Sequence, residues 1–145
     1  MEPLDLTVKP PRHCYEELDG LVFMPRTIDK LRASLEGGKM GVYIINAHVA
    51  GISGFLLESL GVTEEDLREV VRRAPSDEAV AAWLRTQVDS SLYPKLNAMM
   101  ARIETKHSRD PEFVHNYYKE TLSEHPELVT LFDIIEADDR RMFPS

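Results

Sequence analysis

The sequence has little of what several classes of small protein depend on. It contains one cysteine, Cys14, in 145 residues, so it can form neither an internal disulfide nor a zinc site built from several cysteines. Basic residues are in the minority, with 17 Lys and Arg against 25 Asp and Glu and a net charge of −8. Surfaces that bind phosphate backbones are normally basic, so we expect no nucleic-acid partner.

Long apolar segments are missing as well. The longest mostly apolar run, residues 40–61, is interrupted by Asn46, His48 and four glycines, which argues against a membrane span. The first residues, MEPLDLTVKPPRHC, begin with acidic residues, are rich in proline and contain no apolar run, unlike a signal peptide. We therefore expect a cytoplasmic protein with no membrane partner.

The motifs of common cofactor and metal enzymes do not occur either. There is no P-loop, no dinucleotide fingerprint, no His-Glu-x-x-His and no Gly-x-Ser-x-Gly. Two Glu-x-x-His pairs, Glu104–His107 and Glu112–His115, have the spacing used in di-iron bundles. They flank one predicted turn, whereas di-iron ligands lie in the middle of a bundle. The sequence thus predicts no metal site and no cofactor.

The sequence is rich in helical patterns. Its 43% hydrophobic and 29% charged residues are typical of a globular domain, and its length suffices for one core. Apolar residues recur at helical spacing between caps such as Thr63 and Ser76 and stops such as Gly61. We predict an all-α fold, a compact single-domain bundle of about six helices over residues 1–145, with an extended proline-rich arm over residues 1–12.

The predicted helices follow one another with short turns. The segment 13–20 could form one helical turn, and Gly41–Ile45, the one β-like run, is expected to be extended chain. Helices are expected over 24–38 with Gly37-Gly38 as the stop, 53–61, 63–74, 77–88, about 91–107, a helix opened by Asp110-Pro111, and 127–143.

The first predicted helix carries four charged residues within seven positions: Arg26, Asp29, Lys30 and Arg32. Spacings such as Arg26–Asp29 are typical of ion pairs on an ordinary solvated face. Alternatively, the arm or the 41–54 segment covers this face, and a buried guanidinium then needs a carboxylate or an anionic ligand. In that case Arg26 and Arg32 would hold a ligand anion, with Asp29 orienting them or acting as a base.

A second group of candidate residues lies in the apolar, glycine-rich segment 41–54. Tyr43, Asn46 and His48 are its polar members, and polar groups in such runs line pockets or satisfy backbone groups. His48 is either a general base or a hydrogen-bonded structural histidine. We predict Tyr43 and Asn46 as hydrogen-bonding ligand residues.

Several segments together resemble a known family. They are LDLTVKPPR (4–12), the segment 18–32 with its Pro-Arg-x-Ile-Asp-Lys-x-Arg motif, LGV before an acidic helix (60–70), and LFDIIEADDRR (131–141). In this order they are similar to a family of small bacterial proteins catalogued as a domain of unknown function, from which residues 44–54 differ. The resemblance implies a compact helical fold and no particular activity.

These observations predict a small enzyme or ligand-binding protein that acts on a polar or anionic small molecule. The reaction would be a metal-free hydrolysis, isomerisation or elimination by acid–base chemistry. The alternative is a non-catalytic, acidic helical module that binds another protein. The sequence leaves oligomer formation open. The predicted catalytic residues are Asp29 and His48, and the predicted ligand-binding residues are Arg26, Arg32, Tyr43 and Asn46.

Overall fold

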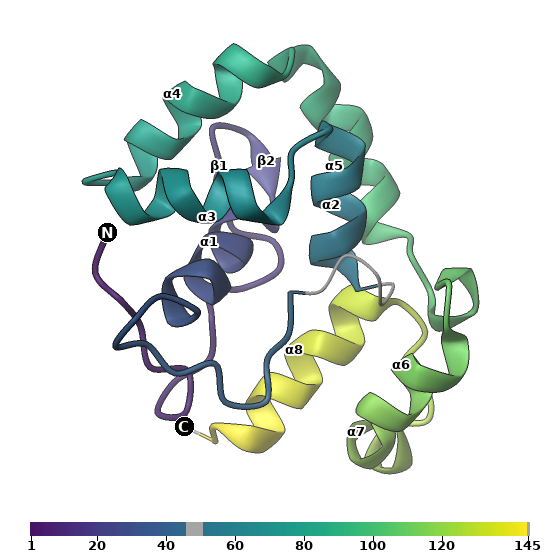
Figure 1. Ribbon diagram of the computed structural model, residues 1–145. Helices are drawn as coiled ribbons and strands as arrows, with labels where there is room; N and C mark the ends of the chain where they lie inside the picture. Colours follow the sequence, from purple (N-terminus) through teal and green to yellow (C-terminus); the bar gives the residue numbers. More distant parts are fainter. Residues whose placement is uncertain (46–50, 145) are drawn as a thin grey trace.

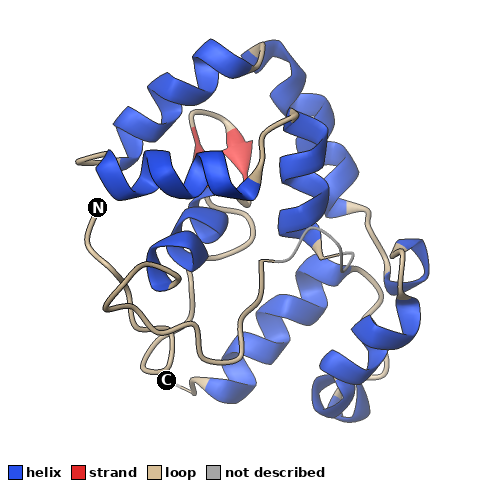
Figure 2. Ribbon diagram, in the orientation of Figure 1, coloured by secondary structure: helices blue, strands red, loops and turns tan. Residues whose placement is uncertain are grey.

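Helices dominate the computed structural model, which describes residues 1–45 and 51–144 (Figure 2). A short antiparallel hairpin, β1 (Glu17–Leu18) and β2 (Leu21–Val22), precedes the first helix. The α-helices are α1 (Met24–Ala33), α2 (Ile52–Leu60), α3 (Glu64–Arg73), α4 (Asp77–Gln87), α5 (Tyr93–Ala101), α6 (Pro111–Tyr117), α7 (Lys119–Glu124) and α8 (Leu131–Met142); the 3₁₀ helices are η1 (Ser90–Leu92) and η2 (Thr105–His107). The predicted all-α class is confirmed. No helix in the described part is long and apolar enough to cross a membrane.

Helix boundaries agree with the sequence wherever a capping side chain defines them. The hydroxyl of Thr63 accepts a hydrogen bond from the Asp66 amide at 3.1 Å, and Ser76 caps α4 in the same way. Gly61 ends α2 with φ of +68°, a left-handed conformation that glycine adopts without strain. These local signals are sufficient to place α2, α3 and α4.

Three segments differ from the prediction. The expected helical turn at 13–20 is wrong, because Asp19 and Gly20, both with positive φ, close the β1–β2 hairpin. α1 ends at Ala33, about one turn before the glycine pair, with Ser34 as its C-cap. The single helix over 91–107 is also wrong, since Ile103 leaves the helix and its carbonyl accepts the Leu131 amide at 2.8 Å.

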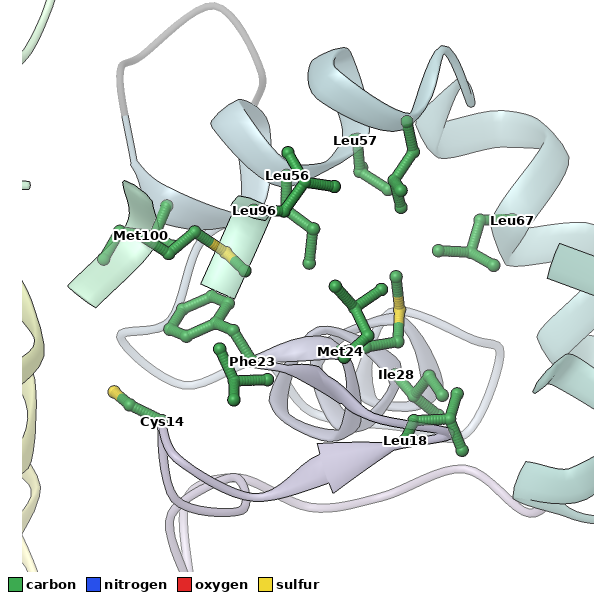
Figure 3. Close-up of a cluster of buried hydrophobic side chains, with 14 of the residues drawn as sticks. Cys14, Leu18, Phe23, Met24, Ile28, Leu56, Leu57, Leu67, Leu96 and Met100 are labelled. Atoms are coloured by element: carbon green, nitrogen blue, oxygen red, sulfur yellow. The ribbon is translucent and has the colours of Figure 1, made fainter. Parts of the chain in front are cut away.

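The main hydrophobic core lies between α1 and the helices α2, α3 and α5. Figure 3 shows Leu56 and Leu57 of α2 pointing toward Met24 and Phe23 at the start of α1. Phe23 is fully buried and stacks on Phe132 of α8, with ring centroids 5.5 Å apart. The core therefore attaches α1 to α2 on one side and to α8 on the other.

α1 is covered on nearly every side, so the solvated-face interpretation of its charges is wrong. Nine of its ten residues are buried. The predicted extended arm runs beside it (Figure 1), where the Leu6 amide donates to the Lys39 carbonyl and the Lys39 amide donates to the Leu4 carbonyl. The arm and the segment after α1 therefore pair with each other along the helix.

Gly38 turns the chain back along α1 and so places Tyr43. A Cβ atom at Gly38 would lie 2.8 Å from the carbonyl carbon of Ala33, which is backbone and cannot move aside. We expect Gly38→Ala to lower the free energy of unfolding by about 2 kcal/mol, as overpacking does. Urea unfolding measures this, with the exposed Glu36→Ala as the control that should change little. Equal stability of both variants would contradict the packing described.

Candidate functional site

The charged residues of α1 belong to two separate clusters. In the first, the Asp29 carboxylate accepts hydrogen bonds from the Arg12 backbone amide at 2.8 Å and from its guanidinium Nη2 at 3.0 Å. The same guanidinium reaches Asp77, the first residue of α4, at 2.5 Å. Asp29 is thus occupied by Arg12 and ties the proline-rich arm to α1 and α4.

The second cluster joins α1 to α8 through a buried ion pair. Arg26, which is 2% exposed, donates from Nη1 to Asp139 Oδ2 at 2.7 Å and from Nη2 to Oδ1 at 3.3 Å. The hydroxyl of Tyr43 donates to the same carboxylate at 2.7 Å. Among the described residues, Arg26 Nε is the one buried side-chain nitrogen or oxygen without a hydrogen-bond partner.

Lys30 lies one helical turn after Arg26 and is also buried, with 8% of its surface exposed. Its ammonium Nζ donates to the Ser53 hydroxyl at 3.2 Å and lies 5.4 Å from the centre of the Phe23 ring. In the described part of the chain it forms no ion pair with a carboxylate, and residues 46–50 contain no Asp or Glu. Burial, and then the positive charge of Arg26, lower the pKa of Lys30 to about 7.

A small cavity lies where these residues meet. Its volume is about 40 Å³, against the roughly 10–15 Å³ that one water molecule requires. It is bounded by α1, α2, α6, α8 and the segment that ends at Ile45; α8 lies between α1 and α6 in Figure 1. The polar lining residues include Arg26, Lys30, Tyr43, Ser53, Asp138 and Asp139, and Tyr117 and Tyr118 also line the cavity.

Both carboxylates at the cavity already have a cationic partner. Asp139 pairs with Arg26, and Asp138 accepts hydrogen bonds from Arg141 at 3.1 Å and from Thr121 at 2.5 Å. Lys30 is therefore the cation at this cavity whose charge is not balanced by a described carboxylate. An amine in this position can gain or lose a proton near neutral pH, or bind an anion.

The comparisons with known proteins identify the family. A family model described as "Domain of unknown function (DUF5069)" matches residues 8–141. The chain belongs to this family. A comparison with curated proteins gives no match. The predicted resemblance is thus confirmed, and because the DUF5069 description names no activity, function has to be argued from the site.

The matched region of this DUF5069 chain holds all six predicted site residues, and the structure brings two of them together. Arg26 and Tyr43 meet on Asp139 at the cavity. Asp29 pairs with Arg12 and is not part of the cavity lining, so its predicted role as an orienting group or base stays a prediction. Arg32 donates to the Glu2 carbonyl at 2.7 Å, outside the cavity lining. The other two, Asn46 and His48, lie outside the described residues.

Sequence reasoning missed four polar residues of the cavity: Lys30, Ser53, Asp138 and Asp139. Lys30 is four positions after Arg26 and hence on the same helix face, a signal that the sequence does contain. The sequence of Asp138 and Asp139, within the charged segment ADDRR (137–141), is typical of a solvated helix end. Their burial depends on how α8 packs against α1, which no local pattern in the sequence reveals.

The pKa of Lys30 implies a pH-dependent stability. A lowered pKa means that folding disfavours the protonated amine, so this cost is full below about pH 7 and vanishes above the ordinary pKa of 10.5. We expect Lys30→Met to be more stable than the parent at pH 6 by an amount on the order of 4 kcal/mol, with the difference shrinking as the pH rises to 10.

Urea unfolding between pH 6 and pH 10 measures this difference. The control is Lys95→Met, which replaces an exposed lysine of α5 and should show no such trend. A constant difference between Lys30→Met and the parent over this range would contradict a buried, uncompensated amine.

Proposed function

We propose that the protein binds a small polar or anionic molecule in this cavity and acts on it by acid–base chemistry centred on Lys30. One observation carries the proposal: the cavity is lined by two residues with buried nitrogen donors, and each nitrogen has an N–H group that no described residue accepts. Lys30 Nζ has no described carboxylate partner, and Arg26 Nε has no described hydrogen-bond partner. In this proposal Lys30 is the base, a role that the sequence analysis predicted for Asp29 and His48.

Electrostatics favour a ligand with an acceptor group. Burying a donor or a cation without a partner costs free energy that a carboxylate or carbonyl oxygen would offset. Arg26 and Lys30 are spaced i,i+4, so their side chains lie on one face of α1, one turn apart. A single small anion can therefore contact both groups, which supports the predicted anion-binding role of Arg26.

The remaining polar groups suit proton transfer next to such a ligand. Near neutral pH a large share of Lys30 is the free amine, which can accept a proton. Burial, and then the hydrogen bond to Asp139, raise the pKa of Tyr43, so its hydroxyl stays protonated and holds the carboxylate in place. Asp139 in turn keeps the guanidinium of Arg26 fixed.

The alternative, an interaction module, has less support. It requires a contiguous exposed apolar patch. Among the described residues, the four most exposed large apolar side chains belong to separate segments: Val8 to the arm, Tyr15 to the residues before β1, Val42 to the segment after α1 and Val129 to the turn before α8. The cavity therefore supports the ligand-binding proposal better than the surface supports the module.

Thermal unfolding with a panel of small anions, including lactate, acetate and phosphate, tests the proposal. A ligand should raise the Tm of the parent by several degrees, because 100-fold saturation adds about 2.7 kcal/mol to stability. The same ligand should shift Lys30→Met much less, since that variant keeps the cavity and removes the amine.

The matched control is Arg32→Ala, which removes a cation of the same helix outside the cavity and should leave the shift unchanged. Equal shifts in the parent and in Lys30→Met would overturn the proposed site. If no anion of the panel shifts the parent, anion binding at this cavity is wrong.

A further inference from the structure

We propose that Lys30 is a nucleophile that forms an imine with the carbonyl carbon of a short-chain 2-oxo acid, whose carboxylate accepts a hydrogen bond from Arg26 Nε. This inference rests on the proposed function and names its substrate class. It follows from the surroundings of the amine, from the buried Arg26 Nε that lacks a described partner and from the size of the cavity.

The surroundings of Lys30 favour the neutral amine over a protonated ammonium that would bind an anion by its charge. A lysine that binds an anion by charge alone gains from keeping its proton. Here the Phe23 ring covers Nζ, and the one described hydrogen-bond partner is the uncharged Ser53 hydroxyl. Arg26, one turn away, adds repulsion between like charges. Desolvation next to a second cation is the arrangement that activates lysines for attack on carbonyl groups.

The geometry of Arg26 limits where a substrate carboxylate can bind. Asp139 and the Arg12 carbonyl occupy Nη1, and Asp139 also accepts from Nη2. Nε is the buried nitrogen of this guanidinium that has no hydrogen-bond partner at all among the described residues. In a 2-oxo acid the carboxylate is bonded directly to the carbonyl carbon. Such a molecule can present its carboxylate to Arg26 and its carbonyl to Lys30 within a small space.

The small cavity volume favours a small substrate. At about 40 Å³ it has room for roughly three water molecules. Compounds with long chains, rings or nucleotides exceed this space, and glyoxylate and pyruvate are the smallest 2-oxo acids. The aromatic lining from Phe23 and Tyr43 also suits the flat carbonyl and carboxylate groups of these acids.

The reaction balances with these groups alone. The lone pair of neutral Nζ attacks the carbonyl carbon, and the former carbonyl oxygen becomes the hydroxyl of a carbinolamine by taking up a proton that Nζ loses. The Ser53 hydroxyl, bonded to Nζ, is in position to relay this proton. Departure of that hydroxyl together with the second proton of Nζ releases one water and leaves the C=N bond. No oxidant, reductant or further reactant is needed.

Trapping by borohydride tests the imine. The parent is incubated with pyruvate at pH 7, reduced with sodium cyanoborohydride and analysed by intact mass and peptide mapping. We expect one adduct, at Lys30, with the mass of one pyruvate less one water plus two hydrogens. Lys30→Met should lose this adduct and Lys95→Met should keep it. Adducts spread over exposed lysines, and equal in Lys30→Met, would overturn the proposal.

A second comparison tests the contact with Arg26 without relying on a variant at a buried ion pair. Acetone has the carbonyl group of pyruvate but lacks its carboxylate. We expect at least about tenfold less trapping of acetone at Lys30 at equal concentration, the loss expected for one charge-assisted hydrogen bond. Equal trapping of both compounds would overturn the role of Arg26 Nε.

The outcomes separate the two proposals. Lactate has no ketone, so a lactate-induced rise in Tm without pyruvate trapping would support anion binding and overturn the imine. Pyruvate trapping at Lys30 without a shift by any anion would overturn the general anion site and keep the covalent step. Absence of trapping with both pyruvate and glyoxylate overturns the imine in either case.

Discussion

Two ion pairs on α1, one half-buried and one buried, are the interactions on which the rest of the structure depends. Asp29 with Arg12 brings the proline-rich arm against one side of the helix, and Arg26 with Asp139 brings α8 against another. Each pair offsets the desolvation of both partners, and loss of one partner would leave a charge buried alone. Half of the residues of α1 can therefore be polar although nearly all of the helix is buried.

Lys30 stands out against this pattern because its burial is not offset in the same way. The charges around it are already paired, and a hydroxyl is its described hydrogen-bond partner. The backbone next to it is unusual as well: Phe23, whose ring covers the amine, has φ of +70°, a left-handed conformation that costs a bulky residue free energy. Such costs are commonly retained where they position a functional group, which agrees with the proposed role of the amine.

The sequence predicts the parts of this protein that depend on neighbouring residues. Thr63, Ser76 and Gly61 each act within a few positions of themselves, so α2, α3 and α4 are predictable from caps and periodicity. The partners of the charged residues of α1 cannot be predicted in this way. Asp29 has basic residues closer in sequence than Arg12, and Asp139 is 113 residues from Arg26. Sequence spacing therefore favours Arg26–Asp29, whereas the packing of the arm and of α8 pairs both residues elsewhere.

The central claim is that Lys30 is a buried amine whose proton is held weakly. A pH titration of the Lys30 side chain by heteronuclear NMR, with its signal assigned by comparison with Lys30→Met, tests this claim most directly. The structure predicts a midpoint near pH 7 for the Lys30 signal. A midpoint near 10.5, the ordinary value for lysine, would show a solvated or ion-paired ammonium and contradict the account.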